Sequence, residues 1–479
     1  MANDDGWRNR LRVAGALAAA GALLSWPALW NGYPLVWPDT GGYIHPVQLV
    51  FRSVFYNFLI APLTWAAGSL WPVVFFQSLV VAYVLRLILR DVFGDASPRT
   101  LLAVTLGLAV LTSLPWVTGL VMADAYAPVV VLALFLLAFC AGTLTRWERL
   151  LMSVIVLEAC LVHLTHPVLA AGLLALFAGY RWAGRKRSAW PVPRLGMPAI
   201  PVVLAVVLLV GNNVIAHHQA RYSVGGYAFT LGRLIADGPA IDYLREACPV
   251  RRYALCDFLD ELPRSLNGFL WSDDSPFRKL GGFKGYQKEG REIVDGTLRR
   301  FPGRVAQAAA INGIRQLSKM RTGGGLVSYR AERWPTDEIR RFFPRDFAAY
   351  ENSRQSRGEL GIRPIRRLHS VAFVAGLLAC AGLLPLLARR GRTLAALLLL
   401  AILSGYVLNA FVTALSVPDD RYGARVAWMI PFFCLACAGS GTWKRSGGAG
   451  EPFRRAPDRR ADFQHPVRAG SAAPDTRGR

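Results

Sequence analysis

Residues 394–415 read LAALLLLAILSGYVLNAFVTAL and contain no charged side chain. About 20 apolar residues in a helix cover the ~30 Å hydrocarbon core of a bilayer. Two further uncharged runs, 101–121 and 129–144, precede this stretch in the chain. Runs of this kind predict an all-α polytopic membrane protein. They exclude a soluble globule, a disordered chain and a small disulfide-rich scaffold.

The composition agrees with a membrane protein and explains the strong positive charge. Of 479 residues, 53% are hydrophobic and 18% are charged, and the formal net charge is +24. Membrane proteins collect Lys and Arg in their cytoplasmic loops, where the inner leaflet is anionic. The chain shows no basic stripe with interleaved aromatic residues and no zinc-finger spacing. We therefore expect anionic lipids as partners, and no nucleic acid.

Apolar stretches and basic loops predict about ten membrane spans. The spans are expected at 13–30, 70–89, 100–120, 128–145, 150–164, 167–180, 197–215, 370–388, 393–415 and 426–441. Arg8, Arg10 and Arg12 precede the first span, so both termini are predicted to be cytoplasmic. Pro167 disfavours one continuous helix across 150–180, which predicts two spans that meet at His163 to Pro167.

This pattern divides the chain into four regions. An N-terminal membrane module, 1–215, includes a first periplasmic loop at 31–69, and a mainly helical periplasmic domain follows at 216–368. A second membrane module is expected at 369–441. The last region, 442–479, is rich in Gly, Pro and Arg and is predicted to be a disordered basic cytoplasmic tail.

Two of the seven cysteines lie outside the predicted spans. Cys248 and Cys256 are both in the expected periplasmic domain, where an oxidising compartment favours disulfides. A disulfide between them is the preferred prediction. A metal pair is the alternative, although no His lies near them in the sequence.

Ionisable and polar side chains gather at the outer ends of several predicted spans. They are Asp39, Asp124, His163, His166, Asp419, Asp420, Arg421, Tyr422 and Arg425. Charges near a bilayer are costly unless they face a cavity or partners, so their placement on one face indicates a site.

Several of these residues also have a purely structural interpretation. Asp39 follows Pro38 and could cap a helix. His163 and His166 share a helical face and could bind a metal, or could simply be structural. Asp420 and Arg421 could form a local ion pair.

The first loop adds a motif that connects these residues to a known group of enzymes. Arg52 and Tyr56 form an Arg-x-x-x-Tyr element in an amphipathic segment after Asp39. Together with Asp124 and the late Asp420-Arg421-Tyr422, this arrangement resembles the GT-C superfamily of polytopic glycosyltransferases. The resemblance covers mainly 13–215 and 400–440, and it matches no individual family.

The resemblance implies a chemistry and a location. These enzymes use polyprenyl-phosphate-linked sugars, and here the site would lie at the periplasmic face of a bacterial inner membrane. Asp39 would be the base and Asp124 would orient the acceptor or help hold a divalent cation, Mg²⁺ or Mn²⁺. The remaining site residues would bind substrate. They are Arg52, Tyr56, His163, His166, Asp420, Arg421, Tyr422 and Arg425.

The first loop departs from the family pattern, because its usual acidic pair is reduced to the single Asp39, which puts metal dependence in doubt. Two other functions are consistent with the sequence. One is a transporter or flippase for a lipid-linked anion, and the other is a non-catalytic protein of envelope assembly. No internal repeat is visible and the polar groups lie at one interface, which favours an enzyme. The sugar stays open, as does the acceptor, which could be a glycan, a lipid or a protein.

Overall fold

The computed structural model describes residues 2–45, 47–184, 190–329 and 334–439, which belong to one compact unit. The regular structure of these residues is helical, with two short 3₁₀ segments and no strand. An all-helical fold was predicted and is confirmed. The predicted disordered tail, 442–479, lies outside the described residues.

A helix lies at each of the ten stretches that were predicted to span the membrane. These helices are α1 (Ala2–Leu24), α5 (Trp71–Asp91), α6 (Pro98–Leu111), α8 (Ala127–Phe139), α9 (Arg146–Leu161), α10 (Thr165–Gly184), α11 (Gly196–His217), α21 (Arg363–Arg389), α22 (Thr393–Ala414) and α24 (Met429–Gly439).

Among the described residues, five helical stretches are long and apolar enough to cross a bilayer. They are α5, α11, α21, α22 and the stretch Asp420–Gly439, which joins α23 (Asp420–Ala427) to α24. These five stretches indicate a multi-pass membrane protein. The number of ten spans stays a prediction, because α6 and the stretch Ala123–Phe139 are shorter.

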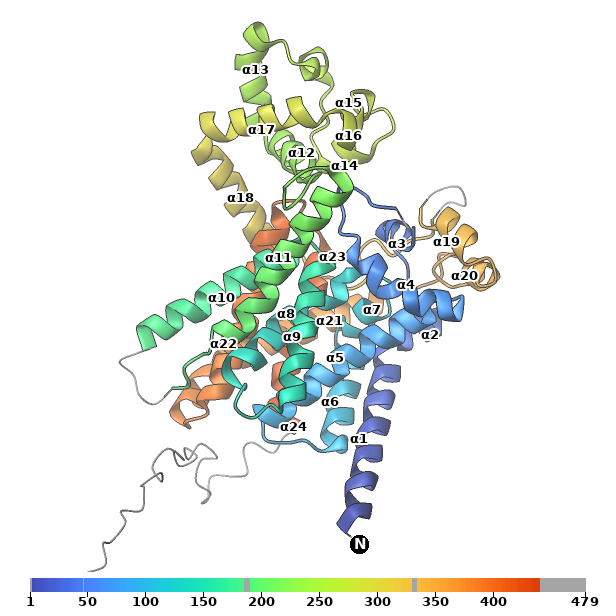
Figure 1. Cartoon of the computed structure of the whole chain (residues 1–479), viewed down its shortest axis with the longest axis vertical. Coiled ribbons are helices and arrows are strands. Elements are labelled where there is room, and N and C mark those ends of the chain that lie inside the picture. Colours follow the sequence, from blue (N-terminus) through green and yellow to red (C-terminus); the bar gives the residue numbers. More distant parts are fainter. Residues whose placement is uncertain (1, 46, 185–189, 330–333, 440–479) are drawn as a thin grey trace, which may run out of the picture. The chain divides into compact units, whose positions relative to one another are not determined.

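Helix α8 forms the centre of the bundle (Figure 1). All of its residues are buried, and it packs against α5, α9, α10, α11 and α22. A helix that is apolar on every side is expected in such an interior position. Helices α11 and α21 instead expose rows of Val, Leu and Ile, as expected of helices that face lipid.

The stretch 150–180 consists of two helices, as predicted. Helix α9 starts at a capping box in which Thr145 and Glu148 exchange hydrogen bonds, and it ends at Leu161. Helix α10 begins at Thr165, with Pro167 in its first turn, where the missing N–H costs nothing. The two helices pack against each other.

The segment between α11 and α21 is mainly helical, as predicted. Its helices are α12 (Gly226–Asp237), α13 (Pro239–Arg251), η2 (Ala254–Glu261), α14 (Leu266–Trp271), α15 (Pro276–Lys279), α16 (Gly282–Gly285), α17 (Gln287–Arg300), α18 (Pro302–Leu317), α19 (Thr336–Phe342) and α20 (Phe347–Glu351). Figure 1 shows α12, α13 and α17 beyond the end of the bundle at which α11 stops.

This segment contributes to two different apolar cores. Buried residues between 227 and 294 form a core of their own, whereas those between 326 and 362 join the core of the helix bundle. Helix α18 connects the two parts and packs along α22. The sulfur atoms of Cys248 and Cys256 are 1.98 Å apart, so the predicted disulfide between α13 and η2 is confirmed.

The membrane topology can be tested with reporter fusions after Thr145, Trp182 and Gly225. If α9 and α10 each cross the bilayer, the fusions at Thr145 and Trp182 report the same side, and Gly225 reports the opposite side because α11 crosses once more. A paired alkaline phosphatase and fluorescent protein reporter measures this directly. Equal signals at Trp182 and Gly225 would contradict the crossing of α11.

Candidate functional site

Two loops that are distant in the sequence lie side by side through backbone hydrogen bonds. The N–H of Leu35 donates to the carbonyl of Gly119 (2.9 Å), and the N–H of Val121 donates to the carbonyl of Leu35 (3.0 Å). The chain on either side carries the two predicted carboxylates. Asp39 follows Leu35 by four residues and Asp124 follows Val121 by three, so both belong to the same region.

Asp39 is held by two arginines from opposite ends of the chain. It lies in the first turn of α3 (Pro38–Ile44). One carboxylate oxygen pairs with Arg52, and the other accepts a hydrogen bond from Nη1 of Arg421 (2.9 Å). Arg52 also donates to the backbone carbonyl of Asp39 (3.1 Å). The carboxylate therefore forms ion pairs and does not cap the helix.

The two arginines decide the protonation of Asp39. Burial alone would raise the pKa of this carboxyl group. The positive charges of Arg52 and Arg421 and the hydrogen bonds from both side chains outweigh burial, so the pKa lies below its ordinary value. Asp39 is consequently ionised at neutral pH.

Aromatic rings hold both guanidinium groups in place. The guanidinium carbon of Arg421 lies 4.9 Å from the ring centre of Trp37 and 4.7 Å from that of Tyr422. The guanidinium carbon of Arg52 lies 5.4 Å from the ring centre of Tyr43. Such cation–π contacts orient the flat side of a guanidinium group while its N–H edge stays available for anions.

A second ion pair lies deeper in the protein. Nη1 of Arg425 donates to Asp124 (2.8 Å), and both side chains are at most 2% exposed. Asn409 of α22 accepts two further hydrogen bonds from Arg425 (2.8 and 3.0 Å), and the hydroxyl of Thr165 accepts another (3.3 Å). Nε of Arg421 lies 3.9 Å from the second oxygen of Asp124, which joins the two ion pairs.

Five of the predicted site residues thus form one group, which we call the charged cluster. It consists of Asp39, Arg52, Asp124, Arg421 and Arg425. Three positive and two negative side chains leave an excess of one positive charge. The cluster can therefore accept a further anion.

The two histidines lie beside the charged cluster. Nδ1 of His163 accepts a hydrogen bond from the N–H of Thr165 (3.2 Å), the residue whose hydroxyl contacts Arg425. His166 stacks on His163, and its Nδ1 donates to the carbonyl of Ala159 (2.6 Å). His163 is therefore linked to the cluster through Thr165, and His166 contacts His163 by ring stacking.

Tyr56 and Asp420 do not contact the charged cluster by hydrogen bonds. The hydroxyl of Tyr56 donates to Gln77 (2.6 Å), and its ring packs on Tyr43, the ring that lies under Arg52. Asp420 accepts a hydrogen bond from the backbone N–H of Arg321 (3.1 Å).

Asp420, Arg421, Tyr422 and Arg425 lie between the predicted spans 393–415 and 426–441, where no helix boundary was expected from the sequence. These residues lie on α23, which begins at Asp420 and continues into α24. The side chain of Asp419 caps this helix by accepting from the N–H of Arg421 (2.8 Å). Helical spacing places Arg421 and Arg425 one turn apart, so both guanidinium groups can reach the same carboxylates.

Residues 319–326, which we call the cover segment, pack on the charged cluster, and sequence reasoning missed them. Gly325 has a φ of +71°, and a Cβ atom there would lie 1.7 Å from the ring of Trp37. A Cβ atom on Gly423 would lie 1.7 Å from the carbonyl oxygen of Lys319. Only glycine permits these two backbone approaches. The one available signal was the run of three glycines at 323–325.

A small cavity of about 30 Å³ lies between the cover segment and the cluster. Its lining includes Ser113, Trp116, Asp124, Thr322, Arg421 and Arg425. Nε1 of Trp116 and the second carboxylate oxygen of Asp124 are buried without a hydrogen-bond partner among the described residues. Buried polar atoms without partners are rare, so this cavity is suited to a small polar molecule of the size of water.

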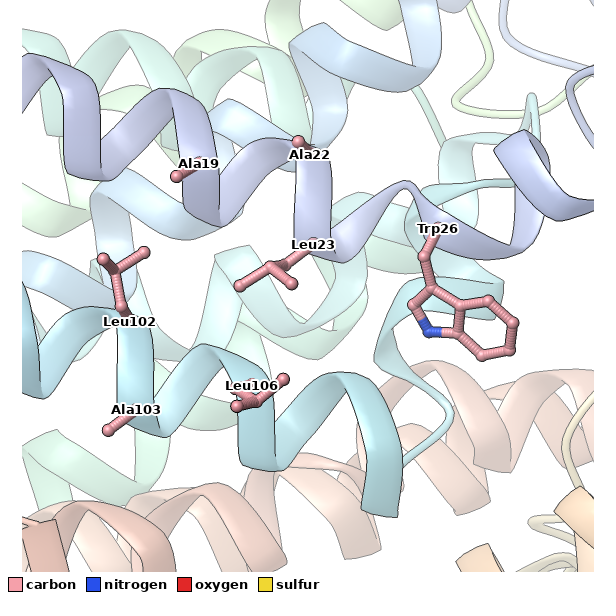
Figure 2. A pocket seen from close by; sticks show the side chains of 7 residues that line it. All are labelled: Ala19, Ala22, Leu23, Trp26, Leu102, Ala103 and Leu106. Carbon is pink, nitrogen blue, oxygen red and sulfur yellow. The ribbon is translucent and has the colours of Figure 1, made fainter.

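An apolar groove of about 640 Å³ runs between α1 and α6 (Figure 2). Its lining consists of Ala19, Ala22, Leu23, Trp26, Leu102, Ala103 and Leu106. Figure 2 shows Trp26 at one end of the groove, and its ring contacts Trp116 edge-on at 5.7 Å between centroids. Because Trp116 also lines the small cavity, two indole rings connect the apolar groove to the charged cluster.

The predicted divalent cation has no dedicated set of ligands in the part of the chain that the structure describes. No group of three or more His, Cys, Asp or Glu side chains gathers there. Asp39 and Asp124, the residues that would hold Mg²⁺ or Mn²⁺, are paired with arginines instead. The cation stays a prediction.

The loss of one partner of the inner ion pair should destabilise the bundle strongly, because the other charge stays buried. Arg425→Gln or Asp124→Asn leaves an uncompensated buried charge, so we expect the free energy of unfolding to fall by about 3–5 kcal/mol. The double variant removes both charges and should recover most of this loss. Thermal and denaturant unfolding in detergent micelles measures the effect.

The control for this prediction is Arg357→Gln, whose partner is Glu359. Both side chains of this pair are about half exposed (48% and 50%), so its loss should cost about 0–1 kcal/mol. Single variants of the inner pair that unfold like Arg357→Gln would contradict the structural role of the buried charges.

Comparisons with family models, with curated proteins and with solved structures found no match for this chain. The function is therefore argued from the chemistry of the charged cluster, the cavity and the groove.

Proposed function

We propose that this protein is a membrane glycosyltransferase that transfers a sugar from a polyprenyl-phosphate donor to an acceptor hydroxyl group. The observation that carries this proposal is the charged cluster, in which two carboxylates meet three arginines beside an apolar groove. Ionisable groups near the membrane are costly to maintain and mark functional sites. A lipid-linked phosphate is a ligand that needs both a groove and a set of arginines.

The groove between α1 and α6 suits the isoprenoid chain of such a donor. Its lining is apolar, and the polar atom of Trp26 is already used, since Nε1 donates to the carbonyl of Ala109 (2.9 Å). Trp26 and Trp116 then lead to the cavity lined by Arg421 and Arg425. Arginine binds phosphate oxygens through two parallel N–H groups, which suits the head group of the donor.

The charged cluster contains the groups that glycosyl transfer requires. The acceptor oxygen attacks the anomeric carbon, the bond from this carbon to the phosphate oxygen breaks, and its electron pair leaves with the phosphate. Arg421 and Arg52 are placed to stabilise the negative charge on the leaving phosphate. Asp39 is the base that takes the proton of the acceptor hydroxyl.

Asp124 has a positioning role in this proposal. It is buried and paired with Arg425, and its second oxygen faces Arg421. The cavity above it has room for a water molecule or two but not for a sugar. A donor sugar can therefore enter only when the cover segment moves away from the cluster.

The proposal includes an orientation and a location. Both termini would be cytoplasmic, as Arg8, Arg10 and Arg12 indicate, in the inner membrane of a bacterium. The charged cluster would then lie at the periplasmic face, where lipid-linked sugars and their acceptors meet. Anionic lipids would surround the basic cytoplasmic ends of the helices.

Asp39→Asn should remove transfer because the amide cannot accept the proton of the acceptor hydroxyl. We expect kcat to fall by about 10²–10⁴-fold, since a base acts in the transition state. Arg421→Lys keeps the charge but loses the double N–H edge, so a smaller loss is expected. The measurement is transfer of labelled sugar from a polyprenyl-phosphate donor in proteoliposomes. Wild-type turnover by Asp39→Asn would refute the assignment of the base.

Ala103→Trp should place an indole in the groove and obstruct the lipid chain of the donor. We expect KM for a long-chain donor to rise by about tenfold, as for a loss of ~1.4 kcal/mol of binding. A donor with a short chain that does not fill the groove should be unaffected. Ala379→Trp is the matched control, because Ala379 is an exposed alanine of another apolar helix, α21. Equal effects of both variants would contradict the assignment of the groove.

A further inference from the structure

In the outer part of the charged cluster, Asp39 accepts hydrogen bonds from both Arg52 and Arg421. Both terminal nitrogens of Arg52 bind Asp39, one at the carboxylate and one at the backbone carbonyl. Arg421 directs Nη1 to Asp39 and Nε toward Asp124. A phosphate that binds through two parallel N–H groups of one arginine needs directions that Asp39 now occupies, so the carboxylate and the phosphate compete for them.

We propose that Asp39 occupies the phosphate site of this protein and that a lipid phosphate displaces it from Arg52 and Arg421. The carboxylate acts as an internal competitor for the anion, and phosphate binding releases it to act as the base. This inference rests on the proposed function, because it takes the phosphate to be that of the lipid-linked donor. It adds an order of events: the phosphate binds first, and only then is a carboxylate oxygen free for the acceptor.

The difference between the outer and inner ion pairs supports this exchange. The side chains of Asp39, Arg52 and Arg421 are 24%, 14% and 12% exposed, so an anion can reach them. Arg425 is 1% exposed, and each of its three side-chain nitrogens donates to Asp124, Asn409 or Thr165. The exchange therefore concerns the outer arginines, and the inner pair stays in place.

The aromatic contacts allow the arginines to change partner without leaving the site. Trp37 and Tyr422 hold the face of the Arg421 guanidinium group, and Tyr43 holds that of Arg52. The exchange then needs a rotation of the Asp39 side chain, together with the movement of the cover segment that admits the donor. In addition, Nε of Arg52 is buried without a hydrogen-bond partner among the described residues, so this guanidinium group can donate one more hydrogen bond.

The exchange also changes the chemistry of Asp39. A carboxylate paired with two arginines is a weak base, because each positive charge favours its ionised form. Once the arginines neutralise a phosphate, this stabilisation decreases and the proton affinity of the carboxylate rises. The proton of the acceptor hydroxyl can then move to the carboxylate oxygen that Arg421 or Arg52 has left.

Removal of the competitor should strengthen phosphate binding, which gives an unusual test. Asp39→Asn should bind farnesyl phosphate about tenfold more tightly than the wild type, as expected for an interaction of a few kT. Calorimetric titration of the full chain in detergent micelles measures the affinity. Farnesol, which lacks the phosphate, should bind both proteins equally. An equal gain for farnesol would overturn the proposal, because the effect would not involve the anion.

The matched control is Asp242→Asn, which also removes one carboxylate from between two arginines. Asp242 lies 2.6 Å from Arg304 and 3.6 Å from Arg245 and is 33% exposed, but it belongs to α13, outside the charged cluster. The change in net charge is the same. This variant should bind farnesyl phosphate with the affinity of the wild type, and an equal gain would overturn the proposal.

Inorganic phosphate distinguishes the two sources of the ligand. If Asp39→Asn binds both farnesyl phosphate and inorganic phosphate more tightly than the wild type does, the site recognises phosphate from either source. A gain for farnesyl phosphate alone supports a site that needs the lipid chain as well. Affinity that is unchanged or lower in Asp39→Asn for both ligands overturns the proposal.

A second pair of variants covers the case in which Asp39→Asn does not fold. Arg52→Gln keeps Asp39 on Arg421, whereas the double variant Asp39→Asn with Arg52→Gln releases Arg421 and replaces both partners of one ion pair. The double variant should bind farnesyl phosphate more tightly than Arg52→Gln alone, and equal affinity would overturn the competition.

Sugar transfer is measured separately, so that the competition and the transferase proposal can fail independently. If Asp39→Asn binds farnesyl phosphate more tightly but the wild type transfers no sugar, the transferase proposal is refuted and the competition stands. If the wild type transfers sugar but Asp39→Asn binds farnesyl phosphate no more tightly, the competition is refuted and the transferase proposal stands.

Discussion

The ion pair between Asp124 and Arg425 is the constraint on which the site depends. A charge in an apolar interior costs several kcal/mol unless a partner and further hydrogen bonds compensate it. Arg425 finds these partners on three separate parts of the chain, at Asp124, Asn409 and Thr165. The beginning of α23 is thereby held against α22, the start of α10 and the turn before α8. The position of Arg421, one helical turn earlier, follows from this.

The outer ion pairs are of a different kind. Asp39, Arg52 and Arg421 are partly accessible, and aromatic rings support the arginines from the side. These side chains are 12–24% exposed, whereas those of the inner pair are at most 2% exposed. The inner pair is therefore closed to solvent, whereas an anion can reach the outer pairs.

The segment between α11 and α21 completes the site from the outside. Gln355 forms a pair of hydrogen bonds with the backbone of Val36 (2.7 and 3.1 Å), and its own N–H donates to Asn31 (2.8 Å). The first loop is thus fixed by residues that follow it by more than 300 positions. The cover segment, on the same part of the chain, then closes over Trp37 and α23. Only this closure produces a cavity beside Arg421 and Asp124.

The sequence by itself was enough to predict the helices, the disulfide and the gathering of ionisable side chains at one end of the predicted spans. Apolar length and composition predict a multi-pass helical protein, Pro167 predicts the break between α9 and α10, and Cys248 and Cys256 stand out as the two cysteines outside the spans. These features depend on local chemistry, which a single chain displays directly.

The tertiary structure decided which charges meet and which residues stay apart. Arg421 reaches Asp39 only because helix α23 begins earlier than the sequence indicated, at a cap formed by Asp419. Tyr56 and Asp420, which share the same sequence region as true cluster members, turn toward Gln77 and the cover segment. The pairing of a buried charge is settled by packing across the whole bundle, and no pattern of neighbouring residues contains that information.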